Sequence, residues 1–317
     1  MILLFGVAVV VTLGATWIGL APVSWDEVTG RAAHGIFWKL RVPRVALAAA
    51  TGATLAVGGA LFQILFRNPL ATPFTLGIST AASMGAAIGV LGGLRGAWLG
   101  VPKLTVVAFL GAAVALGLIL LLARTQGTRD MTRLLLGGVC IASVGSAGIV
   151  LATYLADAAV TNDIVTWMLG SLVTFQIHTA IQVAICLAFI MGFVLRAHRA
   201  LDLIAMDDVV AETRGVAVQR VTLLTLLLVG LSTAIIVSHC GPIAFVGLIV
   251  PHLMRQIVGG QTLRLVVACI AGGASFLVIC DVASRSFSRY EIPIGVFTSI
   301  IGAAFFFYLL ITVKTGE

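Results

Sequence analysis

Residues Val221–Met254 read VTLLTLLLVGLSTAIIVSHCGPIAFVGLIVPHLM, and this run contains no Asp, Glu, Lys or Arg. It is longer than one average membrane span, since about 20 apolar residues in a helix cross the hydrocarbon core of a bilayer. Gly241-Pro242 lies near its middle, and this pair interrupts helices because proline lacks a backbone N–H. The run therefore predicts two consecutive membrane-spanning helices, Val221–His239 and Ile243–Val258, with Pro251 predicting a kink in the second.

The rest of the chain repeats this pattern of apolar stretches separated by short charged connections. Of its 317 residues 60% are hydrophobic and only 10% are charged, and the mean hydropathy is +1.16, which no water-soluble fold of this size can bury. The further candidate spans are Ile2–Ala21, Val45–Phe66, Thr75–Leu94, Leu104–Ala123, Leu134–Ala156, Thr179–Leu195, Leu265–Cys280 and Ile292–Val313. We therefore expect an all-α polytopic bundle of about ten transmembrane helices, filling residues 1–317 as a single membrane domain.

The first apolar stretch is predicted to be a retained span and not a signal peptide. It has no basic residue at its start, and its length exceeds the roughly 7–15 residues of a signal-peptide core. An even number of spans places both termini on one side, and Lys/Arg counting favours the cytoplasm, with eleven basic residues inside and eight outside. We therefore expect a multi-pass protein of the bacterial cytoplasmic membrane with both termini in the cytoplasm.

The longest predicted cytoplasmic connection, residues 196–220, is also the most charged part of the chain. Its apolar residues Leu203, Met206, Val209 and Val210 recur at helical spacing. This spacing predicts a short amphipathic helix lying against the membrane domain. A solvated connector is the alternative interpretation.

Most catalytic chemistry is excluded by the motifs that the sequence lacks. None of its three lysines stands in a Gly-Lys-Ser/Thr phosphate loop, so this chain is not expected to use ATP alone. It has no His-Glu-x-x-His or Gly-x-Ser-x-Gly motif, and its five histidines lack metal-ligand spacing. The basic residues are scattered through short loops, which argues against nucleic-acid binding. We expect no catalytic residue, metal site or cofactor in this chain. We expect its five cysteines to form no disulfide bond and to pack as small apolar side chains.

Ion-coupled carriers need ionisable groups within their spans. Asp281 is the nearest candidate, but Arg285 lies one turn further along and predicts an i,i+4 ion pair. What remains is a passive channel or a pore driven by a partner protein. A stand-alone ion-coupled transporter and an intramembrane enzyme are the alternatives.

Four groups of residues form a recognisable set. In order, they are Arg41-Val-Pro-Arg44 with Arg67-Asn68-Pro69-Leu-Ala; Trp167-x-x-Gly170-Ser171; Gly241-Pro242-Ile-x-Phe-Val-Gly-Leu-Ile-Val-Pro251-His252; and Asp281-x-x-x-Arg285 with Glu291-Ile-Pro293-x-Gly. Taken together, these groups resemble the FecCD-type permease family of importers for ferric siderophores, haem and cobalamin. The sequence departs from the family pattern at Thr72, Met206, Arg214 and Ala304, which affects the expected loop geometry.

The resemblance implies the permease fold of a type II ABC importer, assembled as a homodimer in membrane lipid. It implies two ATP-binding cassette subunits on the cytoplasmic face, which would bind ATP and Mg, and a soluble substrate-binding protein outside. The expected substrate is an iron chelate, with a ferric siderophore as the first choice and haem or cobalamin as alternatives.

The resemblance also implies roles for particular residues. Arg41 and Arg44 would dock the binding protein, and the ATPase would act on Asp207, Asp208, Glu212, Arg214, Gly215 and Val216. The residues with an implied structural or gating role are Asn68, Pro69, Gly170, Ser171, Gly241, Pro242, Pro251, His252, Asp281, Arg285, Glu291 and Pro293.

Overall fold

The computed structural model describes residues 1–18, 37–98, 101–125, 131–173, 177–286 and 291–312, and these are mostly helical. Within these ranges, six helical segments are long and apolar enough to cross a membrane. They are the π-helical turn η1 (Phe37–Arg41) with α3 (Val42–Leu65), α5 (Lys103–Thr125), α6 (Met131–Leu155), α8 (Ile177–Met206), α10 (Val218–Cys240) and α12 (Thr262–Ser286). The all-α membrane class is confirmed.

Four further apolar helices are shorter: α1 (Ile2–Ala15), α4 (Ile78–Leu91), α11 (Val246–Val258) and α13 (Ile294–Thr312). Each of the ten predicted spans coincides with one helix of these two groups, although the predicted ends Ala21 and Val313 lie outside the described residues. Because only six helices within the described residues meet the length for crossing, the count of ten spans stays a prediction. The remaining elements are the 3-10 turn η2 (Pro73–Leu76), α7 (Ala158–Met168), α9 (Asp208–Thr213) and a hairpin of β1 (Ala97–Trp98) and β2 (Val101–Pro102).

Two of the short helices, α4 and α11, begin after a break in the chain. Helix α10 ends at Cys240, and Gly241 adopts a left-handed φ of 69° that suits glycine. Helix α11 then begins at Val246 and continues through Pro251. The predicted break at Gly241-Pro242 is therefore confirmed. Helix α4 follows a comparable interruption, in which Gly77 has a φ of 74° directly before the helix.

The centre of the bundle is formed by α3, which is packed against α12, α8 and α11. Small residues allow these helices to approach at backbone distance, as is usual in membrane proteins. A Cβ added at Gly52 would collide with the backbone carbonyl of Gly273 in α12, and one added at Gly59 would collide with Gly247 in α11. Glycine at these positions therefore sets how closely α3 packs against its neighbours.

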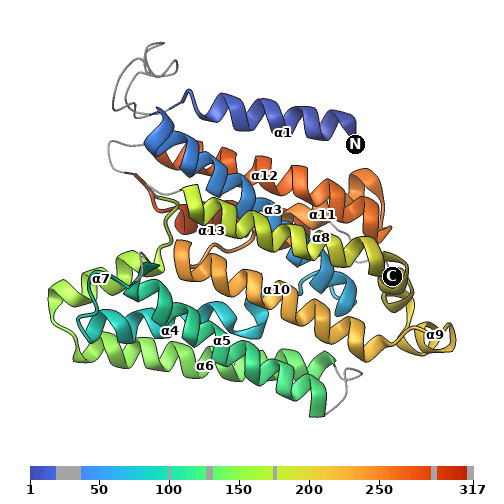
Figure 1. Ribbon diagram of the computed structural model, residues 1–317, viewed down its shortest axis with the longest axis horizontal. Coiled ribbons are helices and arrows are strands. Elements are labelled where there is room, and N and C mark those ends of the chain that lie inside the picture. The colour runs from blue at the N-terminus through green and yellow to red at the C-terminus, as the bar shows by residue number, and fades with distance from the viewer. Residues whose placement is uncertain (19–36, 99–100, 126–130, 174–176, 287–290, 313–317) are drawn as a thin grey trace.

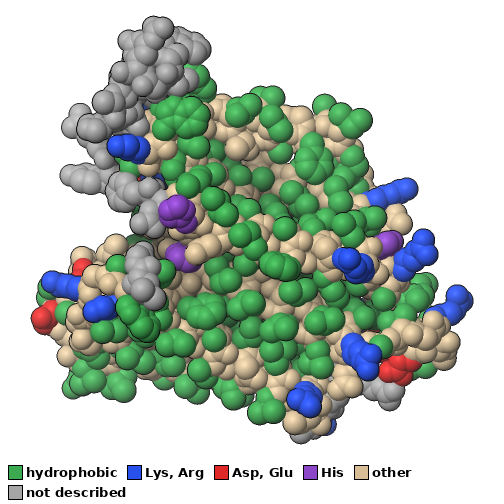
Figure 2. Space-filling view, viewed as in Figure 1, with side chains coloured by type: hydrophobic (Ala, Val, Ile, Leu, Met, Phe, Trp, Pro, Cys, Tyr) green, Lys and Arg blue, Asp and Glu red, His purple; other side chains and the backbone are tan. Residues whose placement is uncertain are grey.

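The helices run between two opposite ends of the molecule, which we name the α7 face and the α9 face after the short helices found there (Figure 1). Helix α1 begins at the α9 face, and α13 starts beside Leu169 at the α7 face and runs away from it. Figure 2 shows Lys, Arg, Asp and Glu side chains gathered at these two ends, with a broad apolar band between them. This distribution matches a protein whose middle is surrounded by lipid.

The predicted cytoplasmic connection 196–220 is largely helical and not a loop. Helix α8 continues to Met206, and the separate helix α9 follows after Asp207. The predicted short helix is present as α9, which buries Asp208 and Ala211. The predicted apolar face was wrong, because Met206, Val209 and Val210 are 74%, 63% and 41% exposed. Charged residues mark where a helix leaves the lipid, but they do not end it.

Candidate functional site

A cluster of four charged side chains lies at the α7 face, where α3, α12 and the start of α13 meet. Asp281 is fully buried, and its carboxylate accepts a hydrogen bond from Nε of Arg44 at 2.8 Å. Arg285 lies 3.3 Å from the same carboxylate, which confirms the predicted i,i+4 pair. The Arg44 guanidinium also donates to both oxygens of Glu291 at 3.0 Å. One buried carboxylate is thus shared by two arginines from different helices.

The arginines of this region also hold the end of α1. Arg285 donates to the carbonyl of Ala15 at 2.7 Å, and Arg41 donates to those of Thr16 and Trp17 at 3.3 and 3.1 Å. The last carbonyls of a helix lack partners within the helix, so these bonds satisfy them. Arg41 is only 5% exposed in the single chain, and its role in docking a binding protein stays a prediction.

Three of the sequence motifs converge beside this cluster in what we name the glycine junction: Gly170, Gly241 and Gly295. The backbone N–H of Ser171 donates to the carbonyl of Cys240 at 2.7 Å, and that of Gly295 donates to the carbonyl of Leu169 at 3.1 Å. A Cβ at Gly170 would lie 2.7 Å from the carbonyl oxygen of Pro242. The motifs thus meet through backbone contacts that admit no side chain.

Gly170 and Gly241 also carry left-handed φ values of 73° and 69°. Of the neighbouring motif residues, Pro242 directly follows Gly241, and Pro293 precedes α13 and accepts from Val296 N–H at 3.1 Å. The α7 face therefore joins α7, α10 and α13 at one point.

At the α9 face, the predicted coupling residues surround α9. Asp207 caps the helix by accepting from the N–H groups of Val209 and Val210 at 2.7 and 3.3 Å. Asp208 is only 6% exposed and forms an ion pair of 3.1 Å with Arg67, which follows α3. The pairing of Arg67 could not be anticipated from the sequence, because 141 residues separate it from Asp208.

The remaining coupling residues end the same helix. Glu212 and Arg214 are exposed. Gly215 has a left-handed φ of 79°, and the N–H of Val216 donates to the carbonyl of Ala211 at 3.0 Å. This arrangement is a glycine helix terminus.

Two motif prolines shape the backbone near α3. Asn68 accepts from the N–H of Leu70 at 2.9 Å across Pro69, which makes a turn after α3. Pro251 cannot donate to the carbonyl of Gly247 one turn earlier. The amide nitrogen of Gln63 lies 3.5 Å from that carbonyl.

A second interaction of Gln63 joins α3 to the end of α11. Arg255 donates to the side-chain oxygen of Gln63 at 3.4 Å. His252, next to Pro251, packs edge-on against Phe305 of α13 with 5.9 Å between ring centroids. These side chains connect α11 to both α3 and α13.

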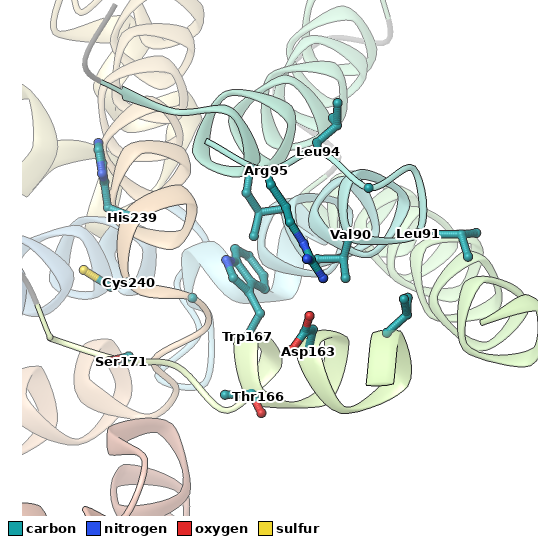
Figure 3. A pocket seen from close by; sticks show the side chains of 14 residues that line it. Val90, Leu91, Leu94, Arg95, Asp163, Thr166, Trp167, Ser171, His239 and Cys240 are labelled. Atoms are coloured by element: carbon teal, nitrogen blue, oxygen red, sulfur yellow. The ribbon is translucent and has the colours of Figure 1, made fainter. Parts of the chain in front are cut away.

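A cavity of about 680 Å³ opens at the α7 face between α4, α7 and the end of α10 (Figure 3). Its walls combine apolar residues with Arg95, Asp163, Trp167, Ser171 and His239. The sequence motifs pointed to Trp167 and Ser171 but not to the other three. No group of His, Cys, Asp or Glu that could hold a metal occurs among the described residues, and all five cysteines are free.

The comparisons with known proteins agree with this arrangement. A sequence profile of the FecCD transport family matches residues 2–312. The chain belongs to the FecCD transport family. Its membrane helices and converging motifs are therefore those of a FecCD transport permease subunit.

Several FecCD relatives are similar over nearly their whole length. The Fe(3+) dicitrate transport system permease protein FecD of Escherichia coli is 37% identical over 306 residues, covering 94% of this chain and 93% of the relative. The hemin transport system permease protein HmuU of Yersinia pestis is 33% identical, covering 96% and 92%. A solved structure of a metal-chelate type ABC transporter in an inward-facing conformation has a TM-score of 0.85 at 28% identity, covering 98% of this chain and 97% of that one.

Proposed function

We propose that this chain is the membrane subunit of an ATP-driven importer that carries an iron chelate across the cytoplasmic membrane. The observation that carries the proposal is the full-length similarity to family members named as permeases for ferric dicitrate and hemin. The missing phosphate loop supports it, since a permease without its own nucleotide site needs a separate ATPase. A ferric siderophore is the first proposed substrate, with haem and cobalamin as alternatives.

In the proposed assembly, two copies of the chain form a homodimer. Two ATP-binding cassette subunits, which bind ATP and Mg, contact the α9 face in the cytoplasm. A substrate-binding protein docks on the opposite α7 face. ATP binding and the loaded binding protein would each favour one of two arrangements of the bundle.

A stand-alone ion-coupled transporter is not favoured by the charged groups within the helices. Asp281 is held by Arg44 and Arg285 at 2.8 and 3.3 Å. Two arginines already compensate the charge of this carboxylate within the protein, which argues against its use as a site for a coupling ion.

Reconstitution in liposomes tests the proposed function. The purified chain, reconstituted with an ATPase and a binding protein encoded in the same genome, should accumulate a radioactive ferric siderophore inside the liposomes only when ATP is enclosed with the ATPase inside and the binding protein is outside. The matched control is an ATPase whose phosphate-loop lysine is replaced, which should give no accumulation. Uptake of the chelate by this chain alone, without ATPase, would contradict the importer proposal.

The coupling role of α9 has its own test at Gly215. Its φ of 79° strains a β-branched side chain, although open space surrounds the position. We expect Gly215→Val to lower substrate-stimulated ATP hydrolysis by about tenfold or more while the complex still assembles, and Gly215→Asn to retain most of it. Equal ATP hydrolysis by both variants and wild type would show that α9 is only a connector.

A further inference from the structure

The cavity at the α7 face has features of a ligand site that the motifs of the family do not account for. Its volume of about 680 Å³ lies within the usual range for small-molecule pockets. It has an apolar wall, formed by Val90, Leu91 and Leu94 at the end of α4, by Leu104 of α5 and by Val160 of α7. After Val160, α7 also contributes Asp163, Thr166 and Trp167 to the lining at helical spacing.

The polar groups of the cavity are available for a ligand. Among the residues that the structure describes, the side chains of Arg95, Asp163, Trp167 and His239 form no hydrogen bond or ion pair with one another or with a neighbour, and those of Arg95 and Asp163 are exposed to solvent. Figure 3 shows the side chains of Arg95, Trp167 and Asp163 close together in the middle of the cavity, with His239 on the α10 side. The Arg95 guanidinium and the Asp163 carboxylate therefore lie in one cavity beside the Trp167 ring without forming an ion pair with each other.

The chemistry of these groups defines what they would bind. Arg95 donates charged hydrogen bonds, so it suits a carboxylate or phosphate, and the Trp167 ring lies beside it. Asp163 only accepts, so it requires a donor such as a hydroxyl or an ammonium group near the anion. The apolar wall accommodates a hydrocarbon portion of the same molecule.

We infer that this cavity binds a ligand with an anionic oxygen group, carboxylate or phosphate, beside a hydroxyl or ammonium donor. Two sources offer this chemistry. A hydroxycarboxylate reaches the cavity from the aqueous side, and an ethanolamine phospholipid reaches it from the bilayer. Binding does not depend on the ATPase, so it can be measured on the purified chain whatever the outcome of the transport experiment.

The position of Trp167 gives such binding a structural consequence. The carbonyl of Trp167 lies 2.7 Å from where a Cβ of Gly241 would stand, so the residue packs directly against the glycine junction. Gly241 and Cys240 also line the cavity. A ligand that contacts Trp167 therefore stabilises one packing of α7 against the end of α10.

The aqueous source is tested with citrate and its analogue tricarballylate, which lacks only the hydroxyl group. Citrate should change the tryptophan fluorescence of the full-length protein in nanodiscs saturably, and Trp167→Phe should remove the change. Tricarballylate should bind several-fold more weakly to wild type, and Asp163→Ala, which removes the acceptor for the hydroxyl group, should abolish this difference. Arg95→Gln should weaken citrate binding about tenfold or more, whereas Arg264→Gln, an exposed arginine at the α9 face, should not.

The bilayer source is tested by native mass spectrometry with added phosphatidylethanolamine and phosphatidylcholine. Preferential retention of phosphatidylethanolamine that is lost in Arg95→Gln supports the inference with lipid as the ligand. Thermal unfolding of each variant establishes that it is folded. The inference is overturned if neither citrate nor phosphatidylethanolamine binds, or if their binding is the same in Arg95→Gln as in wild type, or is equally weakened in Arg264→Gln.

Discussion

At the scale of single residues, Asp281 shows what sequence spacing can and cannot predict. Its pair with Arg285 was predictable because residues four apart lie on the same face of a helix. The contacts of Arg44 with Asp281 and Glu291 were not, since they join positions 237 and 247 residues apart in the chain. A fully buried carboxylate between two arginines depends on the tertiary packing of α3 against α12.

This burial leads to a prediction for stability. Asp281→Asn removes the charge that compensates Arg44 and Arg285, and breaking a buried ion pair typically costs about 3–5 kcal/mol. Glu291→Gln is the matched control, because Glu291 is 45% exposed and exposed pairs contribute about 1 kcal/mol or less. Thermal unfolding of the purified protein should therefore show a much larger drop in Tm for Asp281→Asn. Similar Tm values for the two variants would mean that Asp281 is not essential to the packing of this cluster.

At the scale of elements, helix positions were more predictable than their ends and contacts. The ten apolar stretches located ten helices, and Gly241-Pro242 correctly separated α10 from α11. The end of α8 was missed because arginines and aspartates are compatible with a helix in water as well as with a loop. The meeting of Gly170, Gly241 and Gly295 could not be derived from sequence, since backbone contacts between distant segments leave no periodic pattern.

Close packing of α3 and α12 predicts the effect of adding one methyl group. Gly52→Ala would force a Cβ against the Gly273 carbonyl, and overpacking of this kind typically costs about 1–3 kcal/mol. Gly117→Ala in α5 is the matched control, because no atom lies within 4 Å of its added Cβ. We expect a lower Tm for the first variant and an unchanged or higher Tm for the second. An equal change in Tm for the two variants would indicate that α3 and α12 can move apart without a loss of stability.

The contact between Gln63 and α11 predicts an energetic coupling to Pro251. Alanine at position 251 restores a backbone N–H that can donate to the Gly247 carbonyl. The Gln63 amide should then contribute less to the free energy of unfolding. A double-mutant cycle of Gln63→Leu and Pro251→Ala should give a coupling free energy of about 0.5–1 kcal/mol in unfolding measurements. Strictly additive effects would show that Gln63 acts through Arg255 alone.

At the scale of the whole molecule, the two charged ends and the apolar middle fix an axis across the membrane but not its direction. The sequence favoured cytoplasmic termini by eleven basic residues to eight. The structure adds that the start of α1 and helix α9 lie at the same end (Figure 1). The orientation of the protein in the membrane depends on which loops stay in the cytoplasm during insertion. Neither helix packing nor hydrophobic periodicity determines this.

Cysteine labelling tests this direction. In a variant whose five cysteines are replaced, Arg214→Cys at the α9 face should react with a membrane-impermeant maleimide only after the cells are opened. Trp98→Cys, at a position 65% exposed in the hairpin after α4, should react in intact cells. The reverse pattern would place the termini outside.

The interrupted backbone has an electrostatic consequence for what can pass through the bundle. Helices α4 and α11 contain 14 and 13 residues, about 20 Å each at 1.5 Å per residue, so they reach across only part of a hydrocarbon core of about 30 Å. Helix α11 begins beside Gly59 of the long helix α3, and α4 begins beside Gly138 of α6, so both start inside the protein. A helix carries about half a positive charge at its N-terminal end. A bare cation that came close to either of these helix starts would therefore be repelled, whereas a metal whose charge is masked by its chelator would not.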